Sequence, residues 1–117
     1  METSETVEAL GALAHEHRLA IYRLLVEAGP DGMSAGDIAE RIGLAPSSLT
    51  FHVQSLQRAG LIAQRRLSRQ LFYSADFAAM NELVDYLTRN CCGGKPCATA
   101  CNPVIAQKAT TKPRKTA

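Results

Sequence analysis

Hydrophobic residues recur at three- and four-residue spacing through the first quarter of the chain, and this pattern predicts two amphipathic helices. The first covers 3–14, and the second covers 15–28 with a broader apolar face that ends at Gly29 and Pro30. Spacing of this kind puts apolar side chains on one side of a helix. The Gly-Pro-Asp-Gly sequence that follows predicts a turn, because it combines residues that interrupt helices.

Capping residues as well as spacing predict the next two helices. Ser34 followed three residues later by Asp37 approximates a capping box, and the apolar period runs on to Gly43. Pro46 suits the first position of a following helix, predicted over 45–59, because a proline there gives up no hydrogen bond. Two helices joined by so short a turn predict a helix-turn-helix, with 45–59 as its recognition helix. The inward stripe of that helix is Leu49, Val53 and Leu56.

Two short runs rich in β-forming residues, 61–67 and 71–74, come next and are separated by 68–70. They predict a hairpin with a basic tip, which is called a wing when it follows a helix-turn-helix. A last apolar stripe at helical spacing predicts a fifth helix over 76–90. The predicted fold is therefore mainly α with a small β-hairpin: a winged helix-turn-helix in the order α-α-α-α-β-β-α.

Charge is distributed unevenly along the 117 residues, although the net charge is only +2. The segment 2–40 holds eight of the eleven acids, whereas 41–75 holds five arginines and no acid. A segment of one sign that coincides with the recognition helix and the wing predicts a surface for a polyanion. The length predicts a single globular domain, and its first and fifth helices are apolar enough that we expect a homodimer to cover them.

The N-terminal segment does not resemble a secretory signal, because its first eight residues carry three acids and no base. The longest apolar run, Leu19–Val26, is interrupted by Arg23 and is too short to span a bilayer. We therefore expect a cytoplasmic protein that contacts no membrane. A reducing cytosol favours metal binding or redox sensing over disulfides as the role of its cysteines.

Composition changes after residue 92. The stretch 93–117 contains adjacent glycines, several prolines and no acid, and it ends in a basic segment at Lys108–Lys115. This composition is typical of disordered chain. The sequence therefore predicts a DNA-binding and dimerisation domain over 1–92 and a flexible, cysteine-bearing tail over 93–117. The basic end adds either non-specific DNA affinity or solubility.

Several segments, taken in order, resemble the ArsR/SmtB family of metalloregulatory repressors. They are Leu13–Leu19 before the second helix, Ser47–Val53 in the fourth, Ala59–Ile62 after it, and the wing Arg65–Tyr73. The resemblance implies a homodimer held by the first and last helices, which binds an imperfect palindrome in double-stranded operator DNA and releases it on binding metal. One departure is the wing tip, where Leu67 and Ser68 stand in place of the family's glycine.

The recognition helix and the wing supply the candidate DNA contacts. With the apolar stripe turned inward, polar side chains and Phe51 remain on the outer arcs, and the wing adds guanidinium groups for phosphates or the minor groove. Phe51 contacts either DNA or its own domain. His52 lies at the rim of the stripe, either on the DNA side, as the resemblance implies, or in the core. The candidates are Ser47, Ser48, Thr50, Phe51, His52, Gln54, Arg58, Arg65, Arg66 and Arg69.

Two metal sites of the resembled family are missing from this chain. The Cys-x-Cys pair of some arsenic sensors has no counterpart in 33–38, and the last helix offers Asp76, Glu82 and Asp85 but no histidine. Borderline-hard metals are therefore poor candidates. His15 and His17 flank a helix start, where we expect capping or interface residues and not ligands.

Four cysteines lie within eleven residues, at Cys91, Cys92, Cys97 and Cys101. Thiolates select soft ions, and As(III), like Sb(III), takes three sulfurs in a trigonal pyramid. The predicted ligands are the vicinal pair Cys91 and Cys92 together with Cys97, because the two glycines let the chain turn back towards the pair. Cys101 is the alternative third ligand. The cluster resembles that of arsenic repressors with thiols at or beyond the last helix, and As(III) is then the inducer.

Other roles of the cluster stay open. Cadmium, lead or zinc are alternative ions, although zinc prefers four ligands and an adjacent pair fits it poorly. A thiol redox switch is a further alternative, with Lys95 as the cation that lowers a thiol pKa. No enzymatic activity is expected, because the sequence offers no general base beside the thiols and no phosphate-binding loop.

Overall fold

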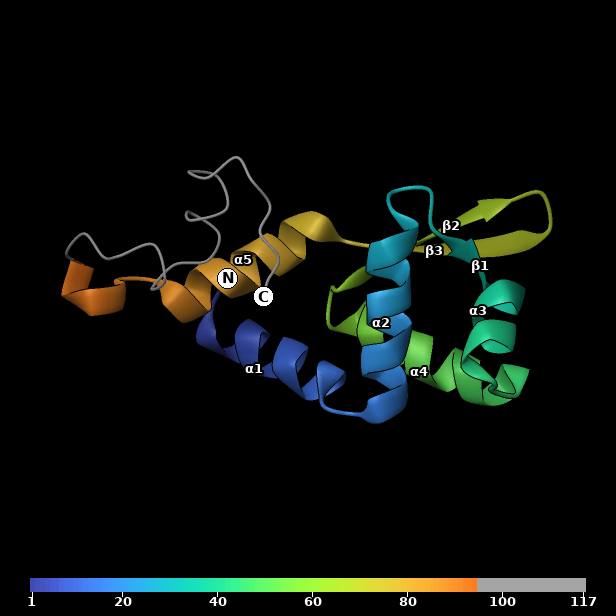
Figure 1. The fold of residues 1–117 in the computed structure, drawn as a ribbon, viewed down its shortest axis with the longest axis horizontal. Helices are drawn as coiled ribbons and strands as arrows, with labels where there is room; N and C mark the ends of the chain where they lie inside the picture. The colour runs from blue at the N-terminus through green and yellow to red at the C-terminus, as the bar shows by residue number, and fades with distance from the viewer. Residues whose placement is uncertain (95–117) are drawn as a thin grey trace. The chain divides into compact units, whose positions relative to one another are not determined.

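The computed structural model describes residues 1–94, which form five α-helices and a small antiparallel sheet (Figure 1). The elements are α1 (Thr3–Leu13), α2 (Glu16–Ala28), β1 (Met33–Ser34), α3 (Ala35–Ile42), α4 (Pro46–Arg58), β2 (Ile62–Leu67), β3 (Gln70–Ala75), α5 (Phe77–Thr88) and a 3-10 turn at Cys91–Gly94. Contacts divide the chain into two units, Met1–Leu83 and Val84–Ala117. The predicted tail over 93–117 lies almost wholly outside the described residues.

Capping chemistry sets the helix boundaries close to their predicted positions. The ring Nδ1 of His15 accepts a hydrogen bond from the backbone N–H of His17 at 3.1 Å and caps α2. The hydroxyl of Ser34 accepts from the N–H of Asp37 at 3.1 Å and caps α3. These bonds satisfy N–H groups that have no partner inside the helix. The predicted capping role of His15 is therefore confirmed.

The sheet has three strands in the order β1-β3-β2, so the prediction of a hairpin alone was incomplete. Met33 pairs with Tyr73 and Ser34 with Phe72, where the sequence predicted a turn followed by the cap of a helix. A two-residue strand is too short to show a period, which is why the pattern missed it. Gly32 precedes it with a φ of 75°, and a Cβ there would collide with the carbonyl oxygen of Tyr73.

The wing turn is shorter than predicted. Leu67 pairs with Gln70, so the loop is the two residues Ser68 and Arg69, and Gln70 belongs to the strand. Ser68 has a φ of 56°. Two-residue hairpins need left-handed backbone in the loop because it matches the twist of the strands. Ser68 thus adopts the conformation for which glycine is the usual choice.

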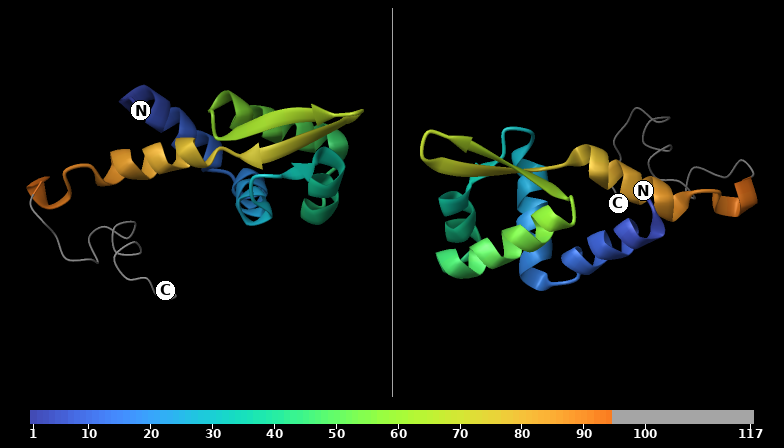
Figure 2. Two further views of the ribbon diagram at one scale, coloured as in Figure 1. Left: turned by 90° about the horizontal axis from the view of Figure 1, so that it is seen from above. Right: turned by 180° about the vertical axis from the view of Figure 1, so that it is seen from behind.

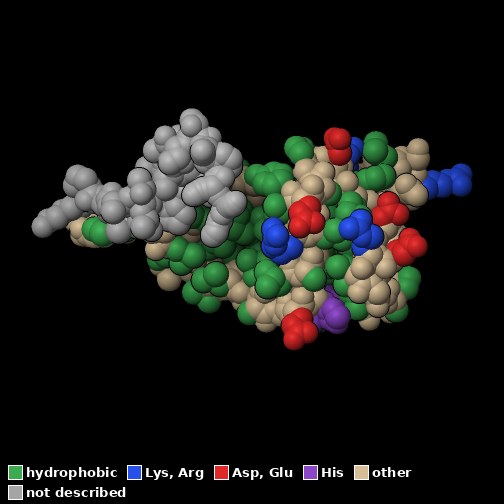
Figure 3. Space-filling model, in the orientation of Figure 1, with side chains coloured by type: hydrophobic (Ala, Val, Ile, Leu, Met, Phe, Trp, Pro, Cys, Tyr) green, Lys and Arg blue, Asp and Glu red, His purple; other side chains and the backbone are tan. Residues whose placement is uncertain are grey.

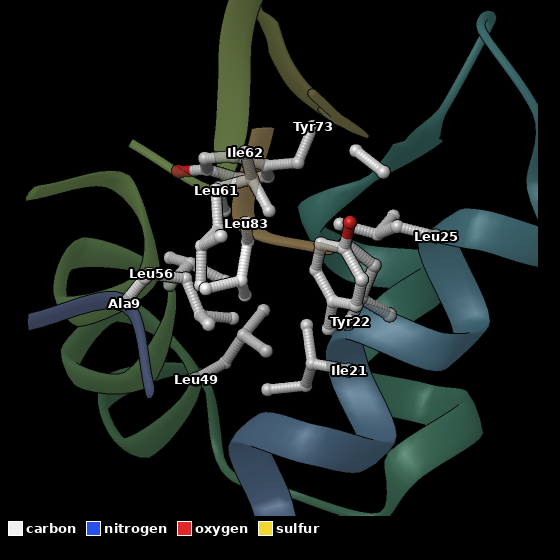
Figure 4. Packing of buried hydrophobic residues seen from close by; sticks show 13 residues of the cluster. Ala9, Ile21, Tyr22, Leu25, Leu49, Leu56, Leu61, Ile62, Tyr73 and Leu83 are labelled. Carbon is white, nitrogen blue, oxygen red and sulfur yellow. The ribbon is translucent and has the colours of Figure 1, made fainter. Parts of the chain in front are cut away.

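The core of the first unit lies where α2 and α4 meet the sheet and α3 (Figure 4). Each large apolar side chain buried there contributes roughly 1.5–3 kcal/mol. The largest fully buried members are Ile21, Leu25, Ile38, Val53, Leu56 and Leu61. This core fixes α4 against the rest of the unit and leaves its opposite face outside.

No helix within the described residues is both long enough and apolar enough to cross a membrane.

Candidate nucleic-acid interface

Backbone hydrogen bonds close the turn between α3 and α4. Gly43 ends α3 with a φ of 83°, and the N–H groups of Gly43 and Leu44 both donate to the carbonyl of Ala39, at 2.8 and 3.0 Å. α4 then begins at Pro46, and its N-cap Ala45 makes no side-chain hydrogen bond. The first N–H groups of α4 can therefore donate to an anion such as a DNA phosphate.

The outward face of α4 carries the side chains predicted to meet DNA. Leu49, Val53 and Leu56 are buried, as the apolar stripe predicts. Six of the candidate residues on this helix are exposed: Ser47, Ser48, Thr50, Phe51, Gln54 and Arg58. The hydroxyl of Thr50 donates to the carbonyl of Pro46 at 3.0 Å, so that its oxygen remains an acceptor for DNA.

Phe51 is 59% exposed, which is unusual for an aromatic ring on a helix that packs well on its other side. Its ring meets that of His52 edge-on at 5.4 Å between centroids. Of the two roles predicted for Phe51, packing inside its own domain is therefore the poorer fit. An exposed ring on this face can contact a thymine methyl group or a sugar.

His52 differs from the other candidates because its side chain is buried. It is 7% exposed, and its Nδ1 lies 3.3 Å from Nη1 of Arg18 on α2. Burial lowers the pKa of His52 below its ordinary value of 6.5, and the charges of His15, Arg18 and His17 lower it further. We therefore leave His52 out of the proposed DNA contacts and place it in the packing beneath the helix.

Sequence reasoning missed Arg18. Its Nε donates to the carbonyl of Ala12 at 2.7 Å, so the same guanidinium contacts the end of α1 and the recognition helix. The contact to His52 spans 34 positions of sequence, and no periodicity reports such a pairing. The one signal was its place in the Leu13–Leu19 segment on which the family resemblance rests.

The wing presents three arginines in unequal settings. Arg65, Arg66 and Arg69 are all exposed. Arg65 also donates to the carbonyl of Asp31 at 2.8 Å and lies 5.5 Å from the centroid of the Phe72 ring. It therefore holds the wing to the loop before β1. Arg66 and Arg69 have no such bond within the described residues.

The recognition helix and the wing face the same end of the first unit. The start of α4 and the tip of the β2–β3 hairpin lie beside α3 in both views of Figure 2. A cationic side chain extends from the hairpin tip in Figure 3, where hydrophobic side chains gather instead over α1. The two elements can therefore engage one nucleic acid together.

We expect Arg66→Ala and Arg69→Ala to weaken binding to every DNA sequence and to reduce the salt slope of binding by about one counterion each. Arg65→Ala should change the slope less, because its guanidinium already contacts protein. The measurement is anisotropy of labelled DNA over a range of salt concentrations. Arg23→Ala is the control, since Arg23 pairs with Glu27 on the exposed side of α2. An unchanged slope in all wing variants would remove the wing from the interface.

The described part of the cysteine cluster lies in the second unit, just after α5. Cys91 is half-buried and Cys92 is exposed. The backbone is left-handed at Asn90 (φ 59°), Cys92 (φ 57°) and Gly93 (φ 69°). Such conformations are rare outside glycine and concentrate at functional positions. The predicted third ligand, Cys97, and its alternative Cys101 lie outside the described residues.

Within residues 1–94, no three histidine, cysteine or acidic side chains form a group that could hold a metal ion. Within a single chain, a thiol site of three ligands therefore needs at least one cysteine from beyond residue 94. The described pair supplies two sulfurs on adjacent residues. The set of three ligands, Cys91, Cys92 and Cys97, stays a prediction.

Comparison with known proteins gives relatives that share both sequence and fold. A family model described as a helix-turn-helix domain matches residues 13–65. The transcriptional activator HlyU of Vibrio cholerae is 29% identical over 90 residues, covering 77% of this chain and 81% of that protein. The HTH-type transcriptional regulator YgaV of Escherichia coli is 31% identical over 83 residues, covering 71% of this chain and 82% of that protein.

Solved structures agree with these matches. HlyU from Vibrio cholerae superposes with a TM-score of 0.59 at 33% identity, covering 74% of this chain and 97% of that one. Reduced HlyU gives 0.58 at 32% identity, covering 73% and 90%. The homodimeric winged helix-turn-helix domain Mb0332 from Mycobacterium bovis gives 0.59 at 22% identity, covering 81% and 88%, and shows likeness of fold alone.

Proposed function

The chain belongs to the ArsR/HlyU type of winged helix-turn-helix transcriptional regulators, and from that premise we propose that it is an arsenite-responsive repressor. It binds operator DNA as a homodimer and releases it when As(III), or Sb(III), is captured by cysteines after α5. DNA binding and clustered thiols both fit a reducing cytoplasm. It regulates and does not catalyse, as its relatives are regulators.

The observation that carries the inducer is the vicinal thiol pair Cys91–Cys92 in a left-handed turn directly after α5, followed by two further cysteines in the sequence. Arsenite in water is As(OH)₃. Three thiols replace its three hydroxyl groups, so that three As–S bonds form and three water molecules leave. Sulfur is the preferred ligand of such soft ions. Cys91, Cys92 and Cys97 would supply the sulfurs.

The proposed homodimer is inferred from large apolar side chains that the described chain leaves exposed. Val7 on α1 is 62% exposed and Leu10 is 41% exposed, while on α5 the exposed residues are Phe77 and Leu87. Exposed apolar faces of this kind mark surfaces that a partner covers. The neighbour Mb0332 is described as homodimeric, which supports a second copy as that partner.

Arsenic binding tests the proposal apart from DNA. Reduced protein is mixed with arsenite, and its remaining thiols are alkylated and counted by mass spectrometry. We expect about one arsenic per chain and protection of three thiols, with Cys101 still alkylated. Protection of fewer than three thiols, or of none, would overturn the proposed site.

We assign the reading of DNA bases to side chains on the outward face of α4. Ser48→Ala or Gln54→Ala should cost about 1–3 kcal/mol on the specific operator and little on random DNA, because the lost group contacts a base edge. The control is Gln57→Ala, which alters an exposed residue beside buried Leu56. Equal losses on operator and random DNA would reassign these side chains to phosphates.

One finding favours a second candidate, a thiol-based redox switch. A solved structure of one relative is described as reduced HlyU, which names the redox state of that protein. In this chain the vicinal cysteines would then respond to oxidant and not to arsenite. Release of DNA by peroxide in the absence of arsenite distinguishes the two.

A further inference from the structure

Three histidines and an arginine lie together where the start of α2 contacts the recognition helix. The ring centroids of His15 and His17 lie 4.7 and 5.6 Å from that of His52. Nη1 of Arg18 lies 3.3 Å from Nδ1 of His52. Histidine side chains reach the surface at the foot of α2 (Figure 3). Neither the proposed DNA contacts nor the cysteines account for this group.

Arg18 connects two helices through one rigid group. Its Nε donates to the carbonyl of Ala12 in the last turn of α1, at 2.7 Å, while Nη1 points to His52 in the middle of α4. A guanidinium is planar and presents its donors in a fixed fork. A shift of α4 away from the end of α1 must therefore break one of the two bonds.

The distance between the two recognition helices of a dimer must match half-sites one helical turn of DNA apart. α1 carries the exposed apolar residues Val7 and Leu10 of the proposed dimer surface, and α4 carries the proposed DNA contacts. The link between these helices therefore bears on operator binding. We propose that Arg18 and His52 position the recognition helix relative to α1, and that protonation of His52 breaks the link and weakens operator binding. This inference rests on the proposed homodimeric DNA binding.

The hydrogen-bond donors of Arg18 determine the protonation state of His52. A guanidinium can only donate, so Nδ1 of His52 must be the acceptor and the ring must be neutral with its proton on Nε2. Protonation converts Nδ1 to a donor and sets two cationic groups against each other. The hydrogen bond is then lost and replaced by repulsion.

The charges that act on His52 all come from the start of α2. They belong to His15, Arg18 and His17, and each lowers the pKa of His52 in addition to the effect of burial. The helices α1 and α3 and the strand β2 also pack against α4 but contribute no charge to this shift among the described residues. Protonation therefore takes place at pH values below 6.5, and the link is intact above that pH.

His52→Asn separates the hydrogen bond from the titration. The side-chain oxygen of asparagine can occupy the position of Nδ1 and accept from Arg18, but it does not titrate. His52→Leu and Arg18→Met remove the acceptor and the donor. His15 and His17 are unchanged in all of these proteins, so a ratio of affinities between two of them reports the change at His52 or Arg18. Thermal unfolding by circular dichroism at each pH establishes that every variant is folded.

Operator affinity is measured by anisotropy of labelled DNA from pH 7.5 to 5.0. At pH 7.5 we expect His52→Asn to bind like wild type, and His52→Leu and Arg18→Met to bind about tenfold more weakly. As the pH falls below 6.5, the operator affinity of the wild type should fall relative to that of His52→Asn by about the same factor. The ratio of wild type to His52→Leu should move towards one.

A constant ratio of wild-type to His52→Asn affinity across this pH range would overturn the inference and leave the proposed function standing. So would wild-type binding by folded His52→Leu protein. If wild type itself fails to bind the operator at pH 7.5, the proposed function falls and this inference falls with it. Where His52→Leu does not fold, the asparagine ratio alone decides.

Discussion

Cys91→Ser, Cys92→Ser and Cys97→Ser proteins should stay on operator DNA at arsenite concentrations that fully release the wild type. Serine keeps the size of cysteine but replaces a soft sulfur with a hard hydroxyl, and two sulfurs cannot complete a three-coordinate site. DNA affinity without arsenite should be unchanged, because Cys91 and Cys92 lie outside the buried core of the first unit. The measurement is anisotropy of labelled operator with arsenite added stepwise.

Cys101→Ser is the matched control and should release DNA like wild type. If it fails to respond while Cys97→Ser responds, the third ligand is Cys101. If all four variants respond normally, the cysteines do not sense arsenite. Loss of DNA binding in the absence of arsenite would instead show that a cysteine supports the fold.

Leu56→Ala should destabilise the protein by about 2–5 kcal/mol, the second large effect we expect. Leu56 is fully buried on the inward face of α4, next to a core that includes Leu61 and Val53. Truncating it loses burial and leaves a cavity in the core beneath the recognition helix. The melting temperature should fall on the order of 10 °C at fixed protein concentration, measured by circular dichroism.

Two control variants accompany the Leu56→Ala measurement. Leu56→Met conserves volume and should cost less than about 1.5 kcal/mol. Gln57→Ala changes the neighbouring exposed residue and should leave stability nearly unchanged. A loss of similar size in Gln57→Ala, or none in Leu56→Ala, would contradict the inward orientation of the α4 stripe.

The helices could be predicted from sequence because their information is local. The inward stripe of α4 repeats at helical spacing and is buried, and Ser34 caps α3 as predicted. Each of these features depends on residues within about one turn of each other. The exposure of Ser48 and Gln54 follows from the same stripe. Much of the proposed DNA-facing surface could therefore be predicted from the sequence.

Features that depend on distant partners could not be predicted. β1 exists because Met33 pairs with Tyr73 forty residues later in the chain. Similarly, Arg65 of the wing donates to the carbonyl of Asp31 in the loop before β1. The burial of His52 depends on α2 lying against α4, since its place at the rim of the stripe allowed either side. Pairings of this kind leave no period in the sequence.

For the cysteine cluster, residue type predicted more than the structure adds. Residue type and clustering were enough to predict a soft-ion site, whereas the backbone at Cys92 adds only that the vicinal pair lies in a left-handed turn. Coordination chemistry depends on which atoms are present more than on which element carries them. The proposal of As(III) thus comes from the sequence, whereas DNA binding is supported by the sequence, the fold and the relatives together.

The most direct test of the account is a titration of the reduced full-length protein on the DNA upstream of its own coding sequence. Arsenite, antimonite, cadmium, zinc and hydrogen peroxide are added in parallel while anisotropy follows release. The account predicts release by arsenite and antimonite near one ion per chain, with the other three leaving the complex intact at equal concentration. A complex that survives excess arsenite, or that only peroxide or zinc dissociates, would contradict it.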